Sequence, residues 1–472
     1  MKQLSGIDAT FLYMETEQTP MHVAGLTLYD LPKGFRGSFH KHFNAFFKTR
    51  VHLIPIFGMK LAKAAFEIDH PGWVDAGELD FDYHIQSVKL PKPGNRKQVE
   101  DLVAELHSTR LDRTKPLWQF TVIEGLEGRQ AALYSKVHHA AVDGGAGMVI
   151  TQALYDVTEE PREVKPPKPK EPARIPTQAE RAVLTMNDIV SNMVRQQLTM
   201  MENMPKLLTQ MTDMIVPVLT GKVGLPQVFA PRTPFNVTVG AARSYAARSI
   251  SLNDVKGISR ATGAKLNDVV MAIVSGAVRK YLLDKQDLPD AALVAFVPIS
   301  MREMGNTDLN NQVFGMNVPL ATNYGDPLKR LSKIQRESGA SKAMAGSVKD
   351  AAPSDFTVVG APTLLPGLMQ LYGRSGLTEM IPQVVNMCIS NNAGPPLPLY
   401  CAGAKVTALY PVSIATHGCG LNVTVQSYLK HLDFGITADH KAVPDVDHLS
   451  DLLVASFEEL KTAVVKAGVA AS

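Results

Sequence analysis

The feature that most constrains the fold of this chain is a proline-rich, charged stretch between residues 160 and 176. Proline has no backbone N–H and a fixed φ, so this stretch can join neither a helix interior nor a central strand, and its charges favour solvent. A second proline cluster, Pro226 to Pro234, precedes another change in composition. We therefore expect an N-terminal domain over residues 1–160, a connecting segment over 161–236 and a C-terminal domain over 237–472.

Both large parts mix strand and helix patterns. A chain of 472 residues exceeds one ordinary core, because domains usually hold about 100–200 residues. Alternation and apolar runs predict strands over 130–139, 293–299 and 420–425, a turn and helix over 140–155, and helices over 266–282 and 449–465. The expected fold class is α/β or α+β, in two domains.

Charge and cysteine content restrict the function classes. The 48 basic and 45 acidic residues give a net charge of +3, whereas a nucleic-acid-binding protein needs a concentrated basic face. Three dispersed cysteines form neither a disulfide framework nor a CxxC metal site. A reducing, cytoplasmic location is expected. No run approaches about 18 uninterrupted apolar residues, so we expect any membrane contact to be peripheral.

The connecting segment carries an apolar stripe. Met186, Met193, Met200, Leu207 and Met214 recur every seven residues, as on one side of a helix. Methionine is flexible and suits surfaces that adapt to varied partners. Two interpretations stay open: a helix packed on the protein body, or a helix that touches a lipid surface.

The chemistry is concentrated in the run from His138 to Gly145, His-His-Ala-Ala-Val-Asp-Gly-Gly. Neighbouring side chains of a strand point to opposite faces. We therefore expect one of the two histidines to face a cleft and the other to face packing. Neutral imidazole can accept the proton of an alcohol that attacks a thioester. Asp143 can fix the turn or orient the imidazole, and glycine at 144 permits a sharp bend.

This motif resembles the HHxxxDG motif of the bacterial wax ester synthase/acyl-CoA:diacylglycerol acyltransferase family. Further blocks of the chain are similar to that family in the same order. They are Leu4 to Asp8, Pro20 to Val23, Trp73 to Asp75, Asp80 to His84, Pro116 to Trp118, Asn267-Asp268, Pro298 to Arg302, Ser390 to Pro395 and Tyr410 to Ser413. In the Ser390 block, Asn392-Ala393 stands where the family has Val-Pro.

The resemblance implies a two-domain, coenzyme A-dependent acyltransferase fold, similar to chloramphenicol acetyltransferase and condensation domains. It places the active site where the two halves meet. His139, the second histidine of the motif, would be the general base, and Asp143 would be structural. Asn267 would support the site, either by donating to the oxyanion or only by capping its helix. His138, Gly144, Asp268, Ser390 and Asn391 complete the expected site.

The expected reaction moves a fatty acyl group from acyl-CoA to a long-chain alcohol or diacylglycerol. Acyl-CoA is a substrate, and no cofactor or metal is expected. The partners would be these substrates and a membrane or lipid inclusion, without nucleic acid. The alternatives are a non-enzymatic lipid-binding or lipid-droplet protein and a related acyltransferase with another hydroxyl acceptor.

Two rival site assignments follow from the same residues. His138 and Asp143 also match HxxxxD, which would make His138 the base. A serine hydrolase would need a GxSxG elbow, which the chain lacks. A basic cluster is formed by Lys89, Lys92, Arg96 and Lys97. We interpret this cluster as a solvated loop and not as a binding site for the phosphates of coenzyme A.

Overall fold

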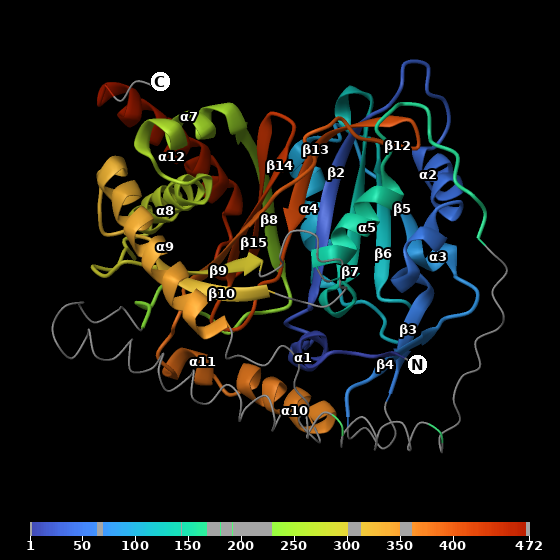
Figure 1. Ribbon diagram of the computed structural model, residues 1–472, viewed down its shortest axis with the longest axis horizontal. Helices are drawn as coiled ribbons and strands as arrows, with labels where there is room; N and C mark the ends of the chain where they lie inside the picture. The colour runs from blue at the N-terminus through green and yellow to red at the C-terminus, as the bar shows by residue number, and fades with distance from the viewer. Residues whose placement is uncertain are drawn as a thin grey trace.

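The computed structural model describes residues 2–63, 69–142, 144–167, 180, 191, 229–300, 313–349 and 361–468. Two six-stranded sheets stand side by side, each covered by helices (Figure 1). The mixed helix and strand content confirms the predicted fold class. Asp143, Met301, Arg302 and the methionine stripe lie outside the described residues, as does most of the connecting segment.

The first sheet belongs mainly to the N-terminal half. Its order is β12 (Tyr400–Cys401), β13 (Ala404–Val412), β2 (His22–Asp30), β7 (Gln130–His138), β6 (Trp118–Glu124) and β5 (Ile85–Lys89). Both faces of β7 are buried, because helices α2 (Phe39–Lys48) and α4 (Arg96–Ser108) pack on opposite sides of the sheet. A smaller sheet joins β1 (Lys2–Gln3), β4 (Gly72–Asp75) and β3 (Met59–Ala62).

Three further helices belong to this half. Helix α1 (Gly6–Met14) begins at Ser5, whose Oγ accepts the N–H of Asp8 at 3.1 Å. Helix α5 (Gly144–Leu154) follows the histidine motif, and the short helix α3 (Phe81–His84) precedes β5. The predicted strand and helix on either side of the motif are confirmed, except that His139 belongs to the turn.

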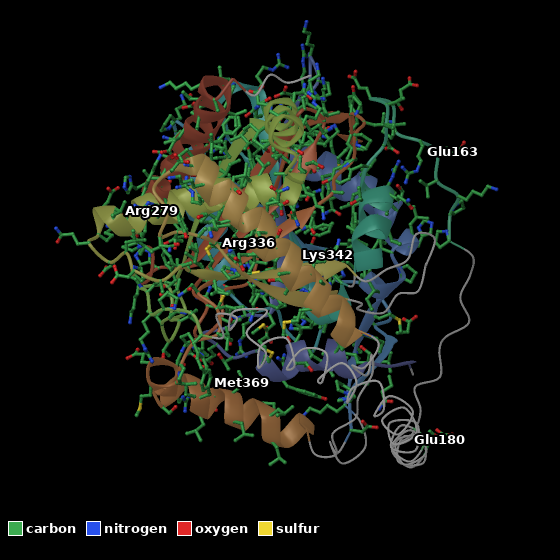
Figure 2. The ribbon with its side chains drawn as sticks, turned by 60° about the vertical axis from the view of Figure 1, so that its left-hand side comes forward. Glu163, Glu180, Arg279, Arg336, Lys342 and Met369 are labelled. Carbon is green, nitrogen blue, oxygen red and sulfur yellow. The ribbon has the colours of Figure 1, made fainter. Side chains whose placement is uncertain are left out.

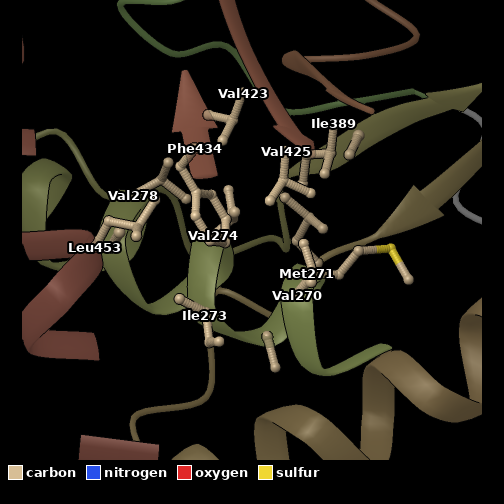
Figure 3. Close-up of a cluster of buried hydrophobic side chains, with 14 of the residues drawn as sticks. Val270, Met271, Ile273, Val274, Val278, Ile389, Val423, Val425, Phe434 and Leu453 are labelled. Carbon is tan, nitrogen blue, oxygen red and sulfur yellow. The ribbon is translucent and has the colours of Figure 1, made fainter. Parts of the chain in front are cut away.

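The second sheet has the order β10 (Val313–Pro319), β9 (Val294–Ser300), β11 (Met387–Asn392), β14 (Leu421–Tyr428), β15 (His431–Asp439) and β8 (Arg243–Ser251). Helix α8 (Leu266–Asp284) is apolar on most of its circumference and packs against both the sheet and helix α12 (Val446–Lys466). Figure 3 shows Val274 of α8 beside Phe434 and Val425 of the sheet. Burial around α8 explains why its apolar pattern is nearly continuous.

Four further described helices belong to the C-terminal part of the chain. They are α7 (Leu252–Thr262), α9 (Pro327–Lys349), α10 (Ala361–Arg374) and α11 (Leu377–Met380). The predicted helices over 266–282 and 449–465 are confirmed as α8 and α12, and the predicted strands over 293–299 and 420–425 as β9 and β14. Among the described helices, none is both long and apolar enough to cross a membrane.

Strands β12 and β13 depart from the expected domain division. Both come from the range 237–472, yet they extend the sheet of the N-terminal half, where β13 pairs with β2. The chain then returns to its own sheet through β14. Strand β13 crosses β15 so closely that a Cβ on Gly435 would lie 1.7 Å from the carbonyl oxygen of Pro411. The two halves are therefore joined by a shared strand as well as by side chains.

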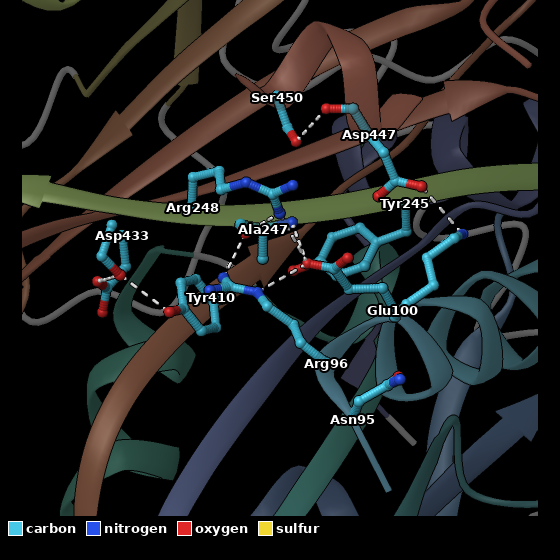
Figure 4. Close-up of polar contacts among 12 residues, drawn as sticks. Asn95, Arg96, Glu100, Tyr245, Ala247, Arg248, Tyr410, Asp433, Asp447 and Ser450 are labelled. Carbon is cyan, nitrogen blue, oxygen red and sulfur yellow. Dashed lines mark hydrogen bonds and ion pairs between the residues drawn. The ribbon is translucent and has the colours of Figure 1, made fainter. Parts of the chain in front are cut away.

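Two residues of the basic cluster link the halves. Arg96 lies 3.0 Å from Glu100 and donates to the carbonyl oxygen of Ala247 in β8. Lys97 reaches Asp447 of α12 at 3.1 Å. Figure 4 shows these contacts gathered around Glu100, with Tyr410 beside the guanidinium. Arg96 and Lys97 lie in the first turn of α4 and not in a loop, and both side chains stay exposed to solvent although they contact the other half.

Candidate active site

The two histidines of the motif sit at the end of β7, where neighbouring strands hold the backbone. The N–H of His138 donates to the carbonyl oxygen of Leu117 at 2.9 Å, and that of His139 to Met21 at 2.8 Å. The chain then turns through the 3₁₀ helix η5 (His139–Ala141). This abrupt end of the strand sends the two imidazoles into different surroundings, as the alternation of a strand predicts.

His138 is fully buried. Its Nδ1 accepts the N–H of Ala140 at 3.0 Å, so its proton lies on Nε2. That Nε2 is 3.5 Å from Oε1 of Glu15, a buried carboxylate that also pairs with Arg113 at 2.6 Å. Burial alone would raise the pKa of Glu15, but His138 and Arg113 lower it to about 2. His138 is thus held by packing and charge.

His139 is partly exposed and lies face to face with Phe11 of α1. The ring centroids are 3.8 Å apart with an interplanar angle of 13°. Nδ1 is buried and makes no hydrogen bond of ordinary geometry with any described residue, which leaves Nε2 as the nitrogen that a substrate can reach. Burial lowers the pKa of His139 to about 4, so the resting imidazole is neutral at pH near 7.

More buried polar groups lie behind the motif. His22 of β2 stands opposite His138 in the strand register, and its Nε2 is 3.0 Å from the carbonyl oxygen of His107. Lys136 of β7 donates to the carbonyl oxygens of Leu106 and Thr109 at 3.0 and 2.9 Å. Burial lowers the pKa of Lys136 to about 8 and that of His107 to about 3. This network fixes the end of β7 from behind.

A second group of expected site residues meets in the C-terminal half. Asn267 lies one residue inside the start of α8 and accepts a hydrogen bond from Nδ2 of Asn391 in β11, at 2.7 Å. Because this contact uses Oδ1 of Asn267, the amide orientation is fixed and Nδ2 remains the donor end. The structure thus brings together two residues that are 124 positions apart.

Asp268, the neighbour of Asn267, has a different role. Its carboxylate is buried and accepts the N–H of Lys265 at 3.0 Å and the hydroxyl of Ser338 at 2.6 Å. Asp268 therefore closes the first turn of α8, and the capping role considered for Asn267 is not the one observed. Ser390, one residue before Asn391, is partly buried in β11.

Two family models match the chain. The wax ester synthase/diacylglycerol acyltransferase catalytic domain matches residues 4–270, and the WS/DGAT C-terminal domain matches residues 309–461. The chain belongs to the WS/DGAT family.

Similar proteins span the whole chain. An O-acyltransferase of Acinetobacter baylyi is 34% identical over 98% of this chain and 100% of its own length. A probable diacylglycerol O-acyltransferase of Mycobacterium tuberculosis is 31% identical over 97% and 98%. The solved wax ester synthase/diacylglycerol acyltransferase of Marinobacter aquaeolei matches with a TM-score of 0.70, 27% identity and coverage of 98% and 100%.

Condensation domains share the fold at much lower identity. The starter condensation domain of rhizomide synthetase has a TM-score of 0.56 and 11% identity, over 98% of this chain and 94% of that domain. This likeness confirms the predicted coenzyme A-dependent acyltransferase architecture.

Several WS/DGAT blocks act through packing. Trp118 of the PLW block stacks on Phe57 and His84 and donates its indole N–H to the carbonyl oxygen of Phe57 at 2.9 Å. In the Ser390 block, a Cβ on Gly394 would lie 1.8 Å from the carbonyl oxygen of Ser427. Glycine is required there because the loop approaches β14 directly.

Sequence reasoning missed Phe11 and Glu15. Both lie just after the Leu4 to Asp8 block, and the available signal was the carboxylate directly behind an apolar run, Phe11 to Met14. Gly144 is the first residue of α5, and Asp143 lies outside the described residues.

The HxxxxD assignment fails, because a fully buried His138 cannot reach a substrate. Among the described side chains, no group of three or more His, Cys, Asp or Glu could hold a metal ion.

The buried histidines make stability depend on pH. Burial lowers the pKa of His22, His107, His138 and His139 below the usual value near 6.5. Between that value and the lower folded-state pKa, the unfolded chain binds protons that the folded chain does not. Stability should therefore be complete above pH of about 6.5 and fall as the pH is lowered, by up to about 1.4 kcal/mol per unit for each group.

Urea unfolding at a series of pH values from about 7.5 to 5 tests this dependence. We expect the midpoint to fall with pH, and the slope to be shallower for His107→Gln. The matched control is His448→Gln, whose side chain is 45% exposed, and it should keep the wild-type slope. A midpoint that is the same throughout this range would contradict the prediction.

Proposed function

We propose that this protein transfers a fatty acyl group from acyl-CoA to the hydroxyl of a long-chain alcohol or diacylglycerol, with His139 as the general base. The observation that carries the proposal is the state of His139. Its ring is neutral, partly exposed and fixed by Phe11, and its buried Nδ1 leaves Nε2 for the substrate. Family membership supplies the substrate class.

The reaction is a direct transfer. The acceptor oxygen attacks the thioester carbonyl while Nε2 of His139 takes the hydroxyl proton. The tetrahedral intermediate then expels the thiolate of coenzyme A, and the imidazolium returns the proton to sulfur. Acyl-CoA is consumed as a substrate, and this proton balance requires no metal or organic cofactor.

Phe11 suits the charged intermediate of this cycle. Burial disfavours the imidazolium, which is why the resting pKa is low. The face of an aromatic ring attracts a cation, so the stacked Phe11 offsets part of that cost when His139 carries the proton. The imidazolium is therefore short-lived and gives its proton up readily to the leaving thiolate.

The other site residues have supporting roles in this proposal. Asn267, oriented by Asn391, donates to the oxyanion. His138 and Glu15 hold the end of β7, and Asp143 and Gly144 shape the turn before α5. Asp268 closes α8, and Ser390 lies beside Asn391 in β11. We retain the division of the chain into domains over residues 1–160 and 237–472 with a connecting segment over 161–236. Strands β12 and β13 of the C-terminal domain belong to the sheet of the N-terminal domain.

The proposal places the protein in the cytoplasm, in peripheral contact with the inner membrane or lipid inclusions. The competing function is a lipid carrier, which would bind the same molecules without a base at position 139. A partly exposed, neutral imidazole at the end of a buried strand favours the enzyme, because a carrier has no use for it.

One assay tests the proposal directly. Purified protein receives palmitoyl-CoA together with hexadecanol and diacylglycerol, while free thiol and each ester are measured. We expect thiol release to match the sum of the two esters. Lipid binding without ester formation would indicate a carrier, and thiol release without ester would indicate hydrolysis to the free acid.

A further inference from the structure

Helix α10 is apolar on the side that faces solvent. Leu364, Leu368 and Leu371 follow one another at helical spacing and are 62%, 57% and 61% exposed. Leu365 and Met369, between them, face the protein and are partly buried. The only charged residue of the helix is Arg374, at its end. A surface helix normally carries mainly polar side chains on its outer face, whereas the exposed side chains that the structure describes on α10 are these three leucines, Gln370 and Arg374.

Other helices of the same half follow the usual rule. Helix α9 turns Lys329, Arg336 and Lys342 outward, and Figure 2 shows Arg336 and Lys342 along its outer side, with α10 and Met369 below. The leucines of α10 are therefore a local exception. Single exposed apolar residues are common, but clustered ones mark an interaction surface.

The apolar surface continues beyond α10. Met380 and Ile381 are 76% and 45% exposed, and Val384 is 49% exposed. We call Leu364, Leu368, Leu371, Met380, Ile381 and Val384 the α10 patch. Two guanidinium groups border it: Arg374 is exposed, and Arg232 donates to the carbonyl oxygen of Ile381 at 3.3 Å. The centre of the patch is thus apolar, and its rim carries these two guanidinium groups and the exposed carboxylate of Glu379.

Among the elements that the structure describes, helix α1 lies between this patch and His139. Helix α1 contacts both α10 and η5, and Figure 1 shows α10 running beneath α1. Leu365 of α10 packs against the cluster that contains Leu12 and Ala140, while Phe11 of α1 stacks on His139. A surface that touches the α10 patch is therefore close to the proposed site.

We propose that the α10 patch docks on a phospholipid surface, from which the protein takes its acceptor lipid. This inference rests on the proposed function, because a long-chain alcohol or diacylglycerol is dissolved in lipid rather than in water. Burial of the leucines would remove apolar area from water, and the rim arginines would meet lipid phosphates. A helix face on which leucines predominate fits a fluid acyl layer better than it fits the polar rim of a protein interface.

Flotation with phospholipid vesicles tests the docking. Wild-type protein is mixed with phosphatidylcholine vesicles that contain a minority of phosphatidylglycerol, and is compared with the triple variant L364S/L368S/L371S. The control variant is L283S/L397S/V465S, which removes side chains that are 48%, 57% and 73% exposed elsewhere. We expect at least about a tenfold loss of vesicle binding for the α10 variant only, with equal melting temperatures for all three proteins.

A second measurement links docking to catalysis. With palmitoyl-CoA, ester formation on hexadecanol embedded in vesicles should fall with vesicle binding in the α10 variant, while esterification of dissolved butanol should not change. Equal flotation of the α10 variant and wild type would overturn the docking proposal. So would a shift from dimer to monomer in the α10 variant, because the patch would then join two copies. If wild type esterifies neither alcohol, the acyl-transfer function fails, whatever the flotation shows.

Discussion

His139→Ala should lower kcat for ester formation by about 10²- to 10⁴-fold, the usual contribution of a general base. The substitution removes Nε2, the only nitrogen of this ring that a substrate can reach, because Nδ1 is buried. It also removes the stack on Phe11, which contributes about 1 kcal/mol, so the protein should remain folded. Steady-state kinetics with palmitoyl-CoA and hexadecanol measure the loss, and circular dichroism confirms the fold.

Two further measurements separate chemistry from structure. Added imidazole should restore part of the activity of His139→Ala, because it can enter the space that the side chain left. His138→Ala is the comparison: it leaves the N–H of Ala140 without its acceptor and should cost about 1–3 kcal/mol of stability. Added imidazole should not rescue it. Unchanged ester formation by His139→Ala would remove this residue from the mechanism.

Asn267→Ala should lower kcat by about 10²- to 10³-fold, the typical effect of losing one oxyanion donor. The KM for acyl-CoA and the melting temperature should change little, because Asn267 is partly exposed and the first turn of α8 is closed by Asp268. Asn391→Ala should have a weaker effect in the same direction, because Asn391 only orients the amide of Asn267 through a 2.7 Å hydrogen bond.

The neighbouring residue supplies the control. Asp268→Ala removes the acceptor of Lys265 N–H and of the Ser338 hydroxyl, so it should lower the melting temperature while kcat per folded molecule stays near the wild-type value. If Asn267→Ala instead loses stability and keeps its kcat, Asn267 supports the helix and not the oxyanion.

The contrast between the two motif histidines explains why the chain keeps both. Glu15 and Arg113 supply the charge around His138. His139 stacks on an apolar ring, Phe11, and burial lowers the pKa of both histidines. In the proposed mechanism, His138 holds the end of the strand and the partly exposed His139 acts as the base.

Local patterns predicted β7, α5, α8, β9, β14 and α12, because such patterns depend on neighbours in the sequence. The apolar run of α8 and the alternation of β7 needed no knowledge of partners. The same information predicted that His138 and His139 would face different surroundings. It also predicted the turn that follows them, where β7 ends and η5 begins.

Such local patterns could not predict contacts between residues that are far apart in the sequence. Nothing in Ala404–Val412 indicates that this strand leaves its own half for the other sheet, since either sheet offers the same backbone hydrogen bonds. The sequence around Arg96 and Lys97 gives no sign that these side chains contact β8 and α12, which lie far away in the chain. Phe11 and Glu15 contact the two motif histidines because of the position that α1 takes in the fold.

The sequence by itself determined how the strand that presents the histidine motif ends and the family to which the chain belongs, and it predicted which residues carry the chemistry. Tertiary structure alone decided that Phe11 stacks on the proposed base, that Asn391 orients Asn267, and that β13 joins the two halves. The reason is physical. Propensity and alternation are set within a few residues, whereas burial, charge pairing and ring stacking depend on groups that only folding brings together.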